Sequence, residues 1–572
     1  MSNPLRRLAL LAALLALLAA NAATAAPTAA SGPTSTRVGR IDVDKATIPE
    51  LEQAMDSHRL TSVRLTQFYL HRIRKLNGKL NAVITVSPTA LADARAADRA
   101  RRHGDHRPLL GIPIIVKDNV NTTGMPTTAG SWALAGSTPS DAFLVQRLRA
   151  AGALIIGKAN LSEWANWRSS PSSSGWSGIG GQTNNPYVLD RNPCGSSSGS
   201  GVVAAADLAV AAVGTETDGS IVCPSGANGV VGIKPTLGLW SRAGVVPITA
   251  DQDTAGPMAR NVTDAAVLLG AATGIDAHDA ATSAQAGHAF HDYTQFLDED
   301  ALAGKRIGVW LDGTIGTATG HDPITEAVLN DAIATLRARG ATVVPGADIL
   351  PDSDATNDIY NAELAALFCE SKTDIGAYLQ TYTAPGYPKT LQALLDFNNA
   401  HPELEGPWNS AIWEVAVATG GRDADCAAQR AAATPPTQAA IDNLMASKNL
   451  DAIIALTNGP AWLTDPVNGD LSHEGDFFVG SSSAAAISGY ADITVPAGYA
   501  GPLPIGITFI GGRWDEPELI GLAYDFEQAT NVRVPPQFLP TLSASATSGQ
   551  KHGTGKVDAQ ALPRERMRLI AR

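Results

Sequence analysis

The first half of the chain alternates between segments with helical spacing of apolar residues and short apolar runs bounded by polar residues. A capping-box pattern at Thr47–Glu50 predicts the start of a helix. Further helices are predicted at 60–77 and 89–104, and a buried strand at 109–120. The segment 141–166 is predicted to form a helix, then a buried strand, then a loop. The alternation continues to about residue 276 and predicts an α/β domain with a largely parallel or mixed sheet.

The pattern changes in the second half of the chain. Between residues 351 and 447 the strand signal fades, and the periodicity predicts helices separated by Pro-rich breaks. Strand signals return at 450–457, 491–499 and 504–512. Residues 541–572 are rich in Ser, Ala and Gly and then basic, which predicts a disordered tail.

The N-terminal residues have the layout of a secretion signal. Arg6 and Arg7 precede an apolar stretch at 8–20, and Ala23-Thr24-Ala25 has the small-residue pattern of a cleavage site. We expect residues 1–25 to be removed and the protein to be exported, to the periplasm or the extracellular medium, without stable membrane association afterwards. A retained membrane anchor is the alternative, and the choice between Sec and twin-Arg export stays open.

Composition limits the classes of partner. The chain has 572 residues, of which 44% are hydrophobic and 17% charged, so it can bury a sizeable core. The net charge is −13 and the body of the chain has no basic run, which argues against nucleic-acid binding. The oligomeric state stays open.

Cysteine and histidine spacing gives no metal site. The chain has four cysteines, at positions 194, 223, 369 and 426, but no C-x-x-C or H-E-x-x-H motif. A bridge between Cys369 and Cys426 and buried free thiols are both open. His103 and His106 lie in a charged, turn-like stretch that predicts a solvated loop. We therefore expect neither metal nor cofactor.

The stretch PCGSSSGSG, residues 193–201, is the clearest candidate for chemistry. Composition alone would favour a flexible linker. Gly195–Gly199 also matches G-x-S-x-G, which would make Ser197 the nucleophile of a Ser-His-Asp α/β-hydrolase. However, a loop-like segment rather than a strand precedes it, and no histidine lies between His106 and His278. A nucleophile without histidine needs another base.

Lys117 is such a base, because it ends an apolar run and its amine would lie in a dry site. Burial lowers the pKa of a lysine, so that the neutral amine can accept a proton. Several further sequence blocks occur in the same chain as Lys117, the serine cluster and the later stretch TETDGSIVCP. In chain order they are GKANLSEWAN, GGQTNNP, GVVGIKPT, DTAGPMARNVTDAA and GLAYDFEQ. From about Ile41 to Thr530 these blocks resemble the amidase signature family. SEWANW, PCGSSSGS and GTETDGSIVCP are most similar to its peptide amidase branch.

The resemblance implies a Ser–cis-Ser–Lys triad. By position, Lys117 matches the family lysine, Ser196 the cis-serine and Ser220 the nucleophile. Thr217, Asp218 and Gly219 would supply an oxyanion hole or contact substrate, and Ser197 would hydrogen-bond within the site. The sequence departs from the common pattern at four positions, which leave the triad intact but put the pocket chemistry in doubt: Cys194, Glu216, Asp218 and Val222, where the family often has Gly, Asp, Gly and Arg.

The resemblance further implies one large α/β domain at 26–540, with a mixed central sheet covered by helices on both faces. Within it, the region 351–447 would shape the acyl pocket, and Trp164, Trp167 and Trp176 would be either pocket or core. The implied reaction is hydrolysis of primary carboxamides, such as C-terminal amides of peptides or amino-acid amides, to carboxylate and ammonia. The alternatives are aryl or acyl amide hydrolysis, a non-catalytic binding protein and an amidotransferase subunit.

Overall fold

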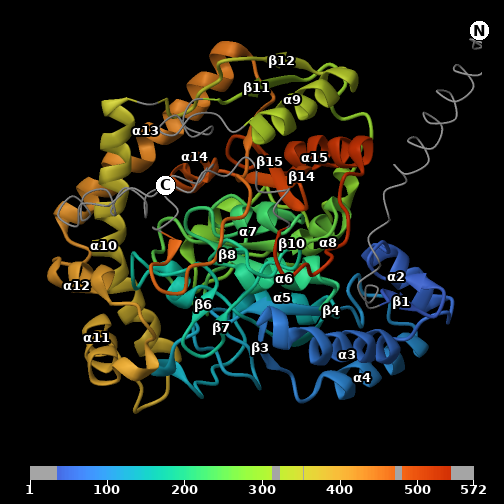
Figure 1. Cartoon of the computed structure of the whole chain (residues 1–572), viewed down its shortest axis with the longest axis horizontal. Coiled ribbons are helices and arrows are strands. Elements are labelled where there is room, and N and C mark those ends of the chain that lie inside the picture. Colours follow the sequence, from blue (N-terminus) through green and yellow to red (C-terminus); the bar gives the residue numbers. More distant parts are fainter. Residues whose placement is uncertain (1–34, 312–322, 352, 471–479, 543–572) are drawn as a thin grey trace, which may run out of the picture. The chain divides into compact units, whose positions relative to one another are not determined.

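A mixed sheet of 11 strands lies at the centre of the structure (Figure 1). Its strands, in spatial order, are β12 (Thr342–Val344), β11 (Arg306–Val309), β13 (Ala452–Leu456), β15 (Leu503–Ile510), β14 (Asp492–Ala500), β9 (Val231–Lys234), β10 (Thr254–Ala259), β8 (Ala211–Glu216), β4 (Pro113–Lys117), β5 (Leu154–Ala159) and β3 (Val83–Val86). Two small antiparallel sheets pair β1 (Arg37–Val38) with β2 (Ile41–Asp42) and β6 (Trp176–Ser177) with β7 (Gly181–Gln182).

Parallel and antiparallel pairing coexist in the large sheet. Strand β4 pairs in parallel with both β5 and β8, whereas β8 and β10 are antiparallel. Every residue of β4, β5, β8, β10, β13 and β15 is buried. Strands that bury consecutive residues must be covered on both faces, so helices flank this sheet. The predicted α/β class with a mixed, helix-covered sheet is therefore confirmed.

Helices connect and cover the strands. They are α2 (Ile48–Asp56), α3 (Ser62–Leu80), α4 (Ala90–Arg102), α5 (Phe143–Ala150), α6 (Ser198–Ala205), α7 (Val222–Ala227), α8 (Val262–Ala272), α9 (Pro323–Ala338), α10 (Asp354–Tyr382), α11 (Leu391–Ala400), α12 (Ala411–Ala418), α13 (Ala424–Lys448), α14 (Ser482–Ser488) and α15 (Glu516–Thr530). The predicted capping box is present, because the Thr47 side chain accepts from the Glu50 N–H and the Glu50 carboxylate accepts from the Thr47 N–H.

Helices α10–α13 form the region that the sequence pattern predicted to be helical. Pro385, Pro388 and Pro407 lie between these helices, as expected. Pro435 and Pro436 do not, because they lie inside the 25-residue helix α13. These two prolines therefore do not separate helices. Packing of α13 against α10 and α14 outweighs the local cost of the missing N–H groups.

The computed structural model describes residues 35–542, apart from 312–322, 352 and 471–479. The described residues from Thr36 onward belong to one compact unit. The expected signal peptide lies outside the described residues, as does all of the expected tail after residue 542. No helix within the described ranges is long and apolar enough to cross a membrane.

Candidate active site

Lys117 is the last residue of β4 and is fully buried. Its Nζ lies 2.8 Å from Oγ of Ser196, 2.9 Å from Oγ1 of Thr215 and 3.2 Å from the carbonyl oxygen of Thr215. Thr215 is close because β4 and β8 run in parallel, with Val116 opposite Val213. The site therefore lies where two adjacent parallel strands end, as is common in α/β sheets.

Burial decides the charge of the lysine. Removal from water lowers the pKa of Lys117 to about 7, although the negative charges of Asp253 and Glu216 act in the opposite direction. A neutral amine has two N–H donors and one lone pair. The two oxygen atoms of Thr215 can accept from the donors, which leaves the lone pair for the Ser196 hydroxyl.

The segment that carries Ser196 is held tightly. The peptide bond between Gly195 and Ser196 is cis, as the resemblance implies. The Ser196 carbonyl accepts a hydrogen bond from the N–H of Ser162 at 3.0 Å. A Cβ atom on Gly195 would lie 2.3 Å from Oγ of Ser162, so only glycine fits here without displacing that hydroxyl.

Ser220 follows β8 at the end of a tight turn, in which Gly219 has a φ of 78°. Only 7% of Ser220 is exposed. Its carbonyl accepts from the N–H of Ser197 at 3.1 Å, which brings the two serine segments together. Within the described residues, no hydrogen bond joins the hydroxyl groups of Ser196 and Ser220 directly.

The predicted oxyanion-hole residues Thr217, Asp218 and Gly219 form this turn, and hydrogen bonds of Thr217 and Asp218 anchor it. Oγ1 of Thr217 donates to Oδ1 of Asp253 at 2.6 Å, and the Thr217 carbonyl accepts from Nε2 of Gln252 at 2.9 Å. The Asp218 carboxylate accepts from the hydroxyl groups of Ser482 and Ser483, the first two residues of α14.

Two carboxyl groups lie at this turn: Glu216, the buried last residue of β8, and Asp218, which is half-buried. Burial raises the pKa of Asp218 to about 6, against the effect of the two serine hydroxyls. Burial also raises the pKa of Glu216, whose Oε2 accepts from the N–H groups of Ile221 and Val222 at 2.6 and 3.0 Å. These contacts use the Glu216 carboxylate to hold the start of α7, which closely follows Ser220.

Ser197 connects the cluster to the sheet. Its Oγ donates to the Thr215 carbonyl at 2.9 Å and accepts from the Thr215 N–H at 3.1 Å. Both atoms of its hydroxyl are thus engaged in backbone contacts with β8. This arrangement agrees with an orienting role and leaves no free hydroxyl hydrogen for Ser197 to act as a nucleophile.

Sequence reasoning missed one covalent feature of the site. All four cysteines are paired, as Cys194–Cys223 and Cys369–Cys426. Of the two interpretations left open, the Cys369–Cys426 bridge is the correct one. The Cys194–Cys223 bridge was not predicted, although both residues flank predicted catalytic serines in the sequence. Thr215, Gln252 and Asp253 were also missed, because no motif marks residues whose role is a hydrogen bond to Lys117 or Thr217.

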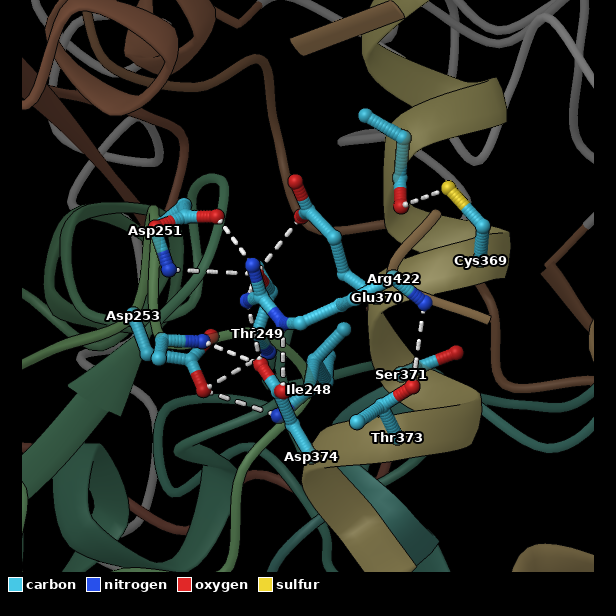
Figure 2. A network of polar contacts seen from close by, with 12 residues as sticks. Ile248, Thr249, Asp251, Asp253, Cys369, Glu370, Ser371, Thr373, Asp374 and Arg422 are labelled. Atoms are coloured by element: carbon cyan, nitrogen blue, oxygen red, sulfur yellow. Dashed lines mark hydrogen bonds and ion pairs between the residues drawn. The ribbon is translucent and has the colours of Figure 1, made fainter. Parts of the chain in front are cut away.

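Ion pairs and hydrogen bonds connect α10 and α13 to residues 249–253, the loop whose side chains contact Thr217. Figure 2 shows Arg422 between Thr249, Asp251 and Asp374, with ion-pair distances of 2.6 Å to each aspartate. Arg430 of α13 donates to Glu370 of α10 and to Oε1 of Gln252, the same residue that contacts Thr217. A cavity of about 400 Å³ lies beside this network. The helical region 351–447 is therefore connected to the turn before Ser220 through Gln252.

The three tryptophans considered for the pocket differ in position. Trp164 and Trp167 are buried in a hydrophobic cluster, where Trp164 packs edge-on against Trp413 and Trp167 packs against Phe368. Trp176 is half-buried and packs edge-on against Trp408. The first two are core residues.

Among the described residues, no group of three or more His, Cys, Asp or Glu side chains is arranged to hold a metal ion. The predicted triad residues, in contrast, lie in one buried region formed by the ends of β4 and β8 and the start of α6.

Comparisons with known proteins agree on one family. The family model described as Amidase matches residues 64–520. A probable amidase of Arabidopsis thaliana is 40% identical over 506 residues, which cover 87% of this chain and 92% of the relative. A glutamyl-tRNA(Gln) amidotransferase subunit from Acinetobacter baumannii is 31% identical, over 86% of this chain and 97% of its own.

Solved structures point the same way. Native peptide amidase from Stenotrophomonas maltophilia is 45% identical, with a TM-score of 0.79, over 86% of this chain and 99% of that chain. A structure of the peptide amidase PAM with the competitive inhibitor chymostatin is also 45% identical, with a TM-score of 0.80 and the same coverage.

Proposed function

The chain belongs to the amidase family and is an amidohydrolase, and we propose that it hydrolyses the C-terminal carboxamides of peptides or amino acids to carboxylates and ammonia. The observation that carries the proposal is the contact between a buried lysine amine and a serine hydroxyl, Lys117 Nζ to Ser196 Oγ, at 2.8 Å. A serine needs a base to become a nucleophile, and an amine with a pKa of about 7 is well matched to that task near neutral pH.

In the proposed acylation step, Oγ of Ser220 attacks the carbon of the substrate amide. The Ser220 proton passes to Oγ of Ser196 while the proton of Ser196 passes to the lone pair of Lys117. Collapse of the tetrahedral intermediate breaks the C–N bond, and the proton returns along the same path to the leaving nitrogen. Ammonia leaves, and the acyl group remains as an ester on Ser220.

Deacylation uses the same groups with water as the nucleophile. Water attacks the ester carbon and gives one proton to Oγ of Ser196, while the proton of Ser196 passes to Lys117. The proton then returns along the same path to the Ser220 oxygen, and the carboxylic acid departs. The negative oxygen in both steps would be held by backbone N–H groups of the turn Thr217–Gly219. Anchoring of this turn by Asp253, Gln252, Ser482 and Ser483 supports such preorganisation, which elsewhere contributes about 2.7–4 kcal/mol per donor.

Similarity to peptide amidase supports the choice of substrate. Val222 also supports it, because it stands where the family often has arginine, so a small anionic substrate lacks that partner. The amidotransferase relative suggests a different activity, which would require transfer of ammonia to a second substrate. Release of free ammonia distinguishes simple hydrolysis from that transfer.

The experiment is ammonia release from a panel of peptide amides, amino-acid amides, aryl amides and fatty-acid amides. We expect the highest kcat/KM on peptide amides, with internal peptide bonds intact, and a loss of at least about 10³-fold in the Ser220→Ala variant. Higher kcat/KM on aryl or fatty-acid amides would reject the substrate proposal but keep the reaction class. Equal ammonia release by wild type and Ser220→Ala would reject the mechanism.

We also propose that the enzyme acts outside the cytoplasm. The layout of residues 1–25 supports export, and the pairing of all four cysteines supports an oxidising compartment. Expression of the whole chain in a bacterial host, followed by fractionation and mass measurement, tests this. We expect a product cleaved near Ala25 in the periplasm or medium, and an uncleaved cytoplasmic product would contradict it.

A further inference from the structure

One disulfide joins the two chain segments that carry the proposed catalytic serines. Cys194 is two residues before Ser196, and Cys223 is three residues after Ser220. Their Cα atoms are 5.9 Å apart and their sulfur atoms are bonded. The disulfide therefore joins the two serine segments at positions no more than three residues along the chain from Ser196 and Ser220.

Each half of this disulfide is also attached by hydrogen bonds to residues beside a serine. The Cys194 carbonyl accepts from Oγ of Ser198, at the start of α6. The Cys223 N–H donates to the Gly219 carbonyl at 2.8 Å. A movement of either sulfur atom is thus transmitted to the segment of Ser196 or to the turn of Ser220 without an intervening flexible loop.

The surroundings of the bond are rigid. Cys194 and Cys223 are 5% and 9% exposed, and they pack with Ala227 and the partly buried Trp462. The Cys194 N–H donates to Oδ1 of Asn192 at 2.8 Å. A buried sulfur pair that is closely packed cannot rotate freely, so it can fix a distance.

Noncovalent links also join the two segments, besides the hydrogen bonds of the Ser197 and Ser200 hydroxyls to β8. The Ser197 N–H donates to the Ser220 carbonyl at 3.1 Å, and Nδ2 of Asn228 donates to the carbonyls of Pro193 and Pro224 at 2.8 and 2.7 Å. These bonds can each open on a short timescale, whereas the disulfide cannot. Because the hydroxyls of Ser196 and Ser220 share no direct hydrogen bond among the described residues, their separation depends on how the two backbones are held.

We infer that the Cys194–Cys223 disulfide is a positioning element for acylation, which holds Ser220 at the distance from Ser196 that proton transfer requires. The inference rests on the proposed function, because it assumes that Ser196 takes the proton of Ser220. Proton transfer is steeply dependent on distance, and a misplacement of about 1 Å can cost about 10²-fold in rate. The bond would therefore affect kcat more than KM.

The second disulfide is a matched control. Cys369 and Cys426 connect α10 with α13, and their Cα atoms are also 5.9 Å apart. Both of these cysteines are buried as well, but neither helix contains a residue of the proposed triad. Loss of this bond removes a covalent constraint of the same kind from helices that carry neither serine.

The experiment compares Cys194→Ala/Cys223→Ala with Cys369→Ala/Cys426→Ala, each checked for folding by circular dichroism. Two rates are measured: kcat for ammonia release from a peptide amide, and the rate at which a fluorophosphonate modifies Ser220. We expect both rates to fall by about 10- to 100-fold in the first variant, with KM changed less than about threefold, and to fall much less in the second, where the two serine segments keep their covalent link.

A chemical arm covers the case in which the first variant does not fold. In Cys369→Ala/Cys426→Ala the only remaining disulfide is Cys194–Cys223. A water-soluble phosphine and one water molecule convert it to two thiols and a phosphine oxide, and an oxidant such as oxidised glutathione restores the bond by thiol–disulfide exchange. We expect the labelling rate of Ser220 to fall on reduction and to recover on reoxidation while the circular dichroism stays constant.

Three results would overturn the inference: a folded first variant with unchanged rates, equal losses of rate in both variants, or unfolding on reduction, which would make the bond a device for stability. Failure of the proposed function is distinguishable from these. If wild type releases ammonia from none of the amides but fluorophosphonate labelling depends on the Cys194–Cys223 bond as expected, the substrate proposal fails and the positioning role stands.

Discussion

The Nζ atom of Lys117 lies 2.8 Å from Oγ of Ser196, and both residues are completely buried. A charged ammonium group in this position would lack water on every side, and burial therefore favours the neutral amine. The contact thus joins a proton acceptor to a hydroxyl that can pass a proton on. Changes to this pair, or to the parts of the structure that hold it, should alter the rate, its pH dependence or the stability of the fold.

The pH dependence of the reaction should follow the charge of Lys117. Burial lowers the pKa of this lysine to about 7, and only the neutral form can accept a proton. We expect kcat/KM for a peptide amide to rise with pH through about 7 and then to level off. The measurement is ammonia release between pH 5 and 10, and a rate that is constant across pH 6 to 8 would contradict the prediction.

Asp253→Asn should move this pH dependence toward acid. Burial raises the pKa of Asp253 itself to about 7, so this carboxyl is negative mainly on the upper part of the acid limb. There its charge raises the pKa of Lys117, and its removal lets the lysine lose its proton at lower pH. The asparagine carbonyl can still accept from Oγ1 of Thr217, but its amide group replaces Oδ2, which accepts from the N–H groups of Ile248 and Thr249, so folding of the variant is checked by circular dichroism. We expect the acid limb of the kcat/KM profile at lower pH than in wild type. A limb at the same or higher pH would show that Asp253 does not set the charge of the lysine.

Gly195→Ala should destabilise the protein, because its Cβ would lie 2.3 Å from Oγ of Ser162. That hydroxyl accepts from the Gly175 N–H at 2.8 Å and cannot move without losing this bond. Overpacking of this kind costs about 1–3 kcal/mol, and we also expect kcat to fall because Ser196 is the next residue.

Gly78→Ala is the control for this substitution. Gly78 lies in α3, where an added Cβ meets nothing within 4 Å. Alanine there should stabilise the helix by up to about 1 kcal/mol. The free energy of unfolding in urea measures both variants, and equal values for the two would refute the packing argument.

Lys158→Met should destabilise the loop that follows Lys117. Nζ of Lys158 lies 3.4 Å from Oδ1 of Asp118 and donates to the carbonyl of Val120 at 2.7 Å, all in a fully buried setting. Its removal leaves the Asp118 carboxyl without its ion pair, which costs about 3–5 kcal/mol in comparable cases.

The surface lysine Lys305 offers a comparison. Its Nζ lies 2.6 Å from Glu518, but the lysine and glutamate side chains are 31% and 37% exposed. Exposed ion pairs contribute about 0–1 kcal/mol, so Lys305→Met should change the free energy of unfolding by no more than that. A loss for Lys158→Met as small as that for Lys305→Met would contradict the prediction.

A local pattern predicted the strand that carries Lys117, whereas the two serine segments needed the family resemblance. The apolar run before Lys117 predicted a buried strand, and β4 ends at that residue. The Gly/Ser cluster and the turn before Ser220 were identified through the family resemblance. Thr215 could not be identified as the partner of Lys117, because that requires knowing that β8 lies beside β4, and strand order depends on the whole chain.

Other features depend on tertiary contacts that no local pattern reveals. Four cysteines allow three pairings, and spacing alone does not choose among them. Pro435 and Pro436 would end an isolated helix, yet α13 continues through them because it is packed against α10. In both cases the answer depends on which segments lie side by side.

The central claim is that Lys117, Ser196 and Ser220 act as one proton-transfer unit. Its most direct test is ammonia release from a peptide amide by Lys117→Ala, Ser196→Ala and the variant that carries both substitutions. Groups that act as a unit are strongly non-additive, so each single change should lower kcat by about 10²–10⁴-fold and the double change should cost little more than either one. Multiplicative losses in the double variant, or a single variant as active as wild type, would contradict the claim.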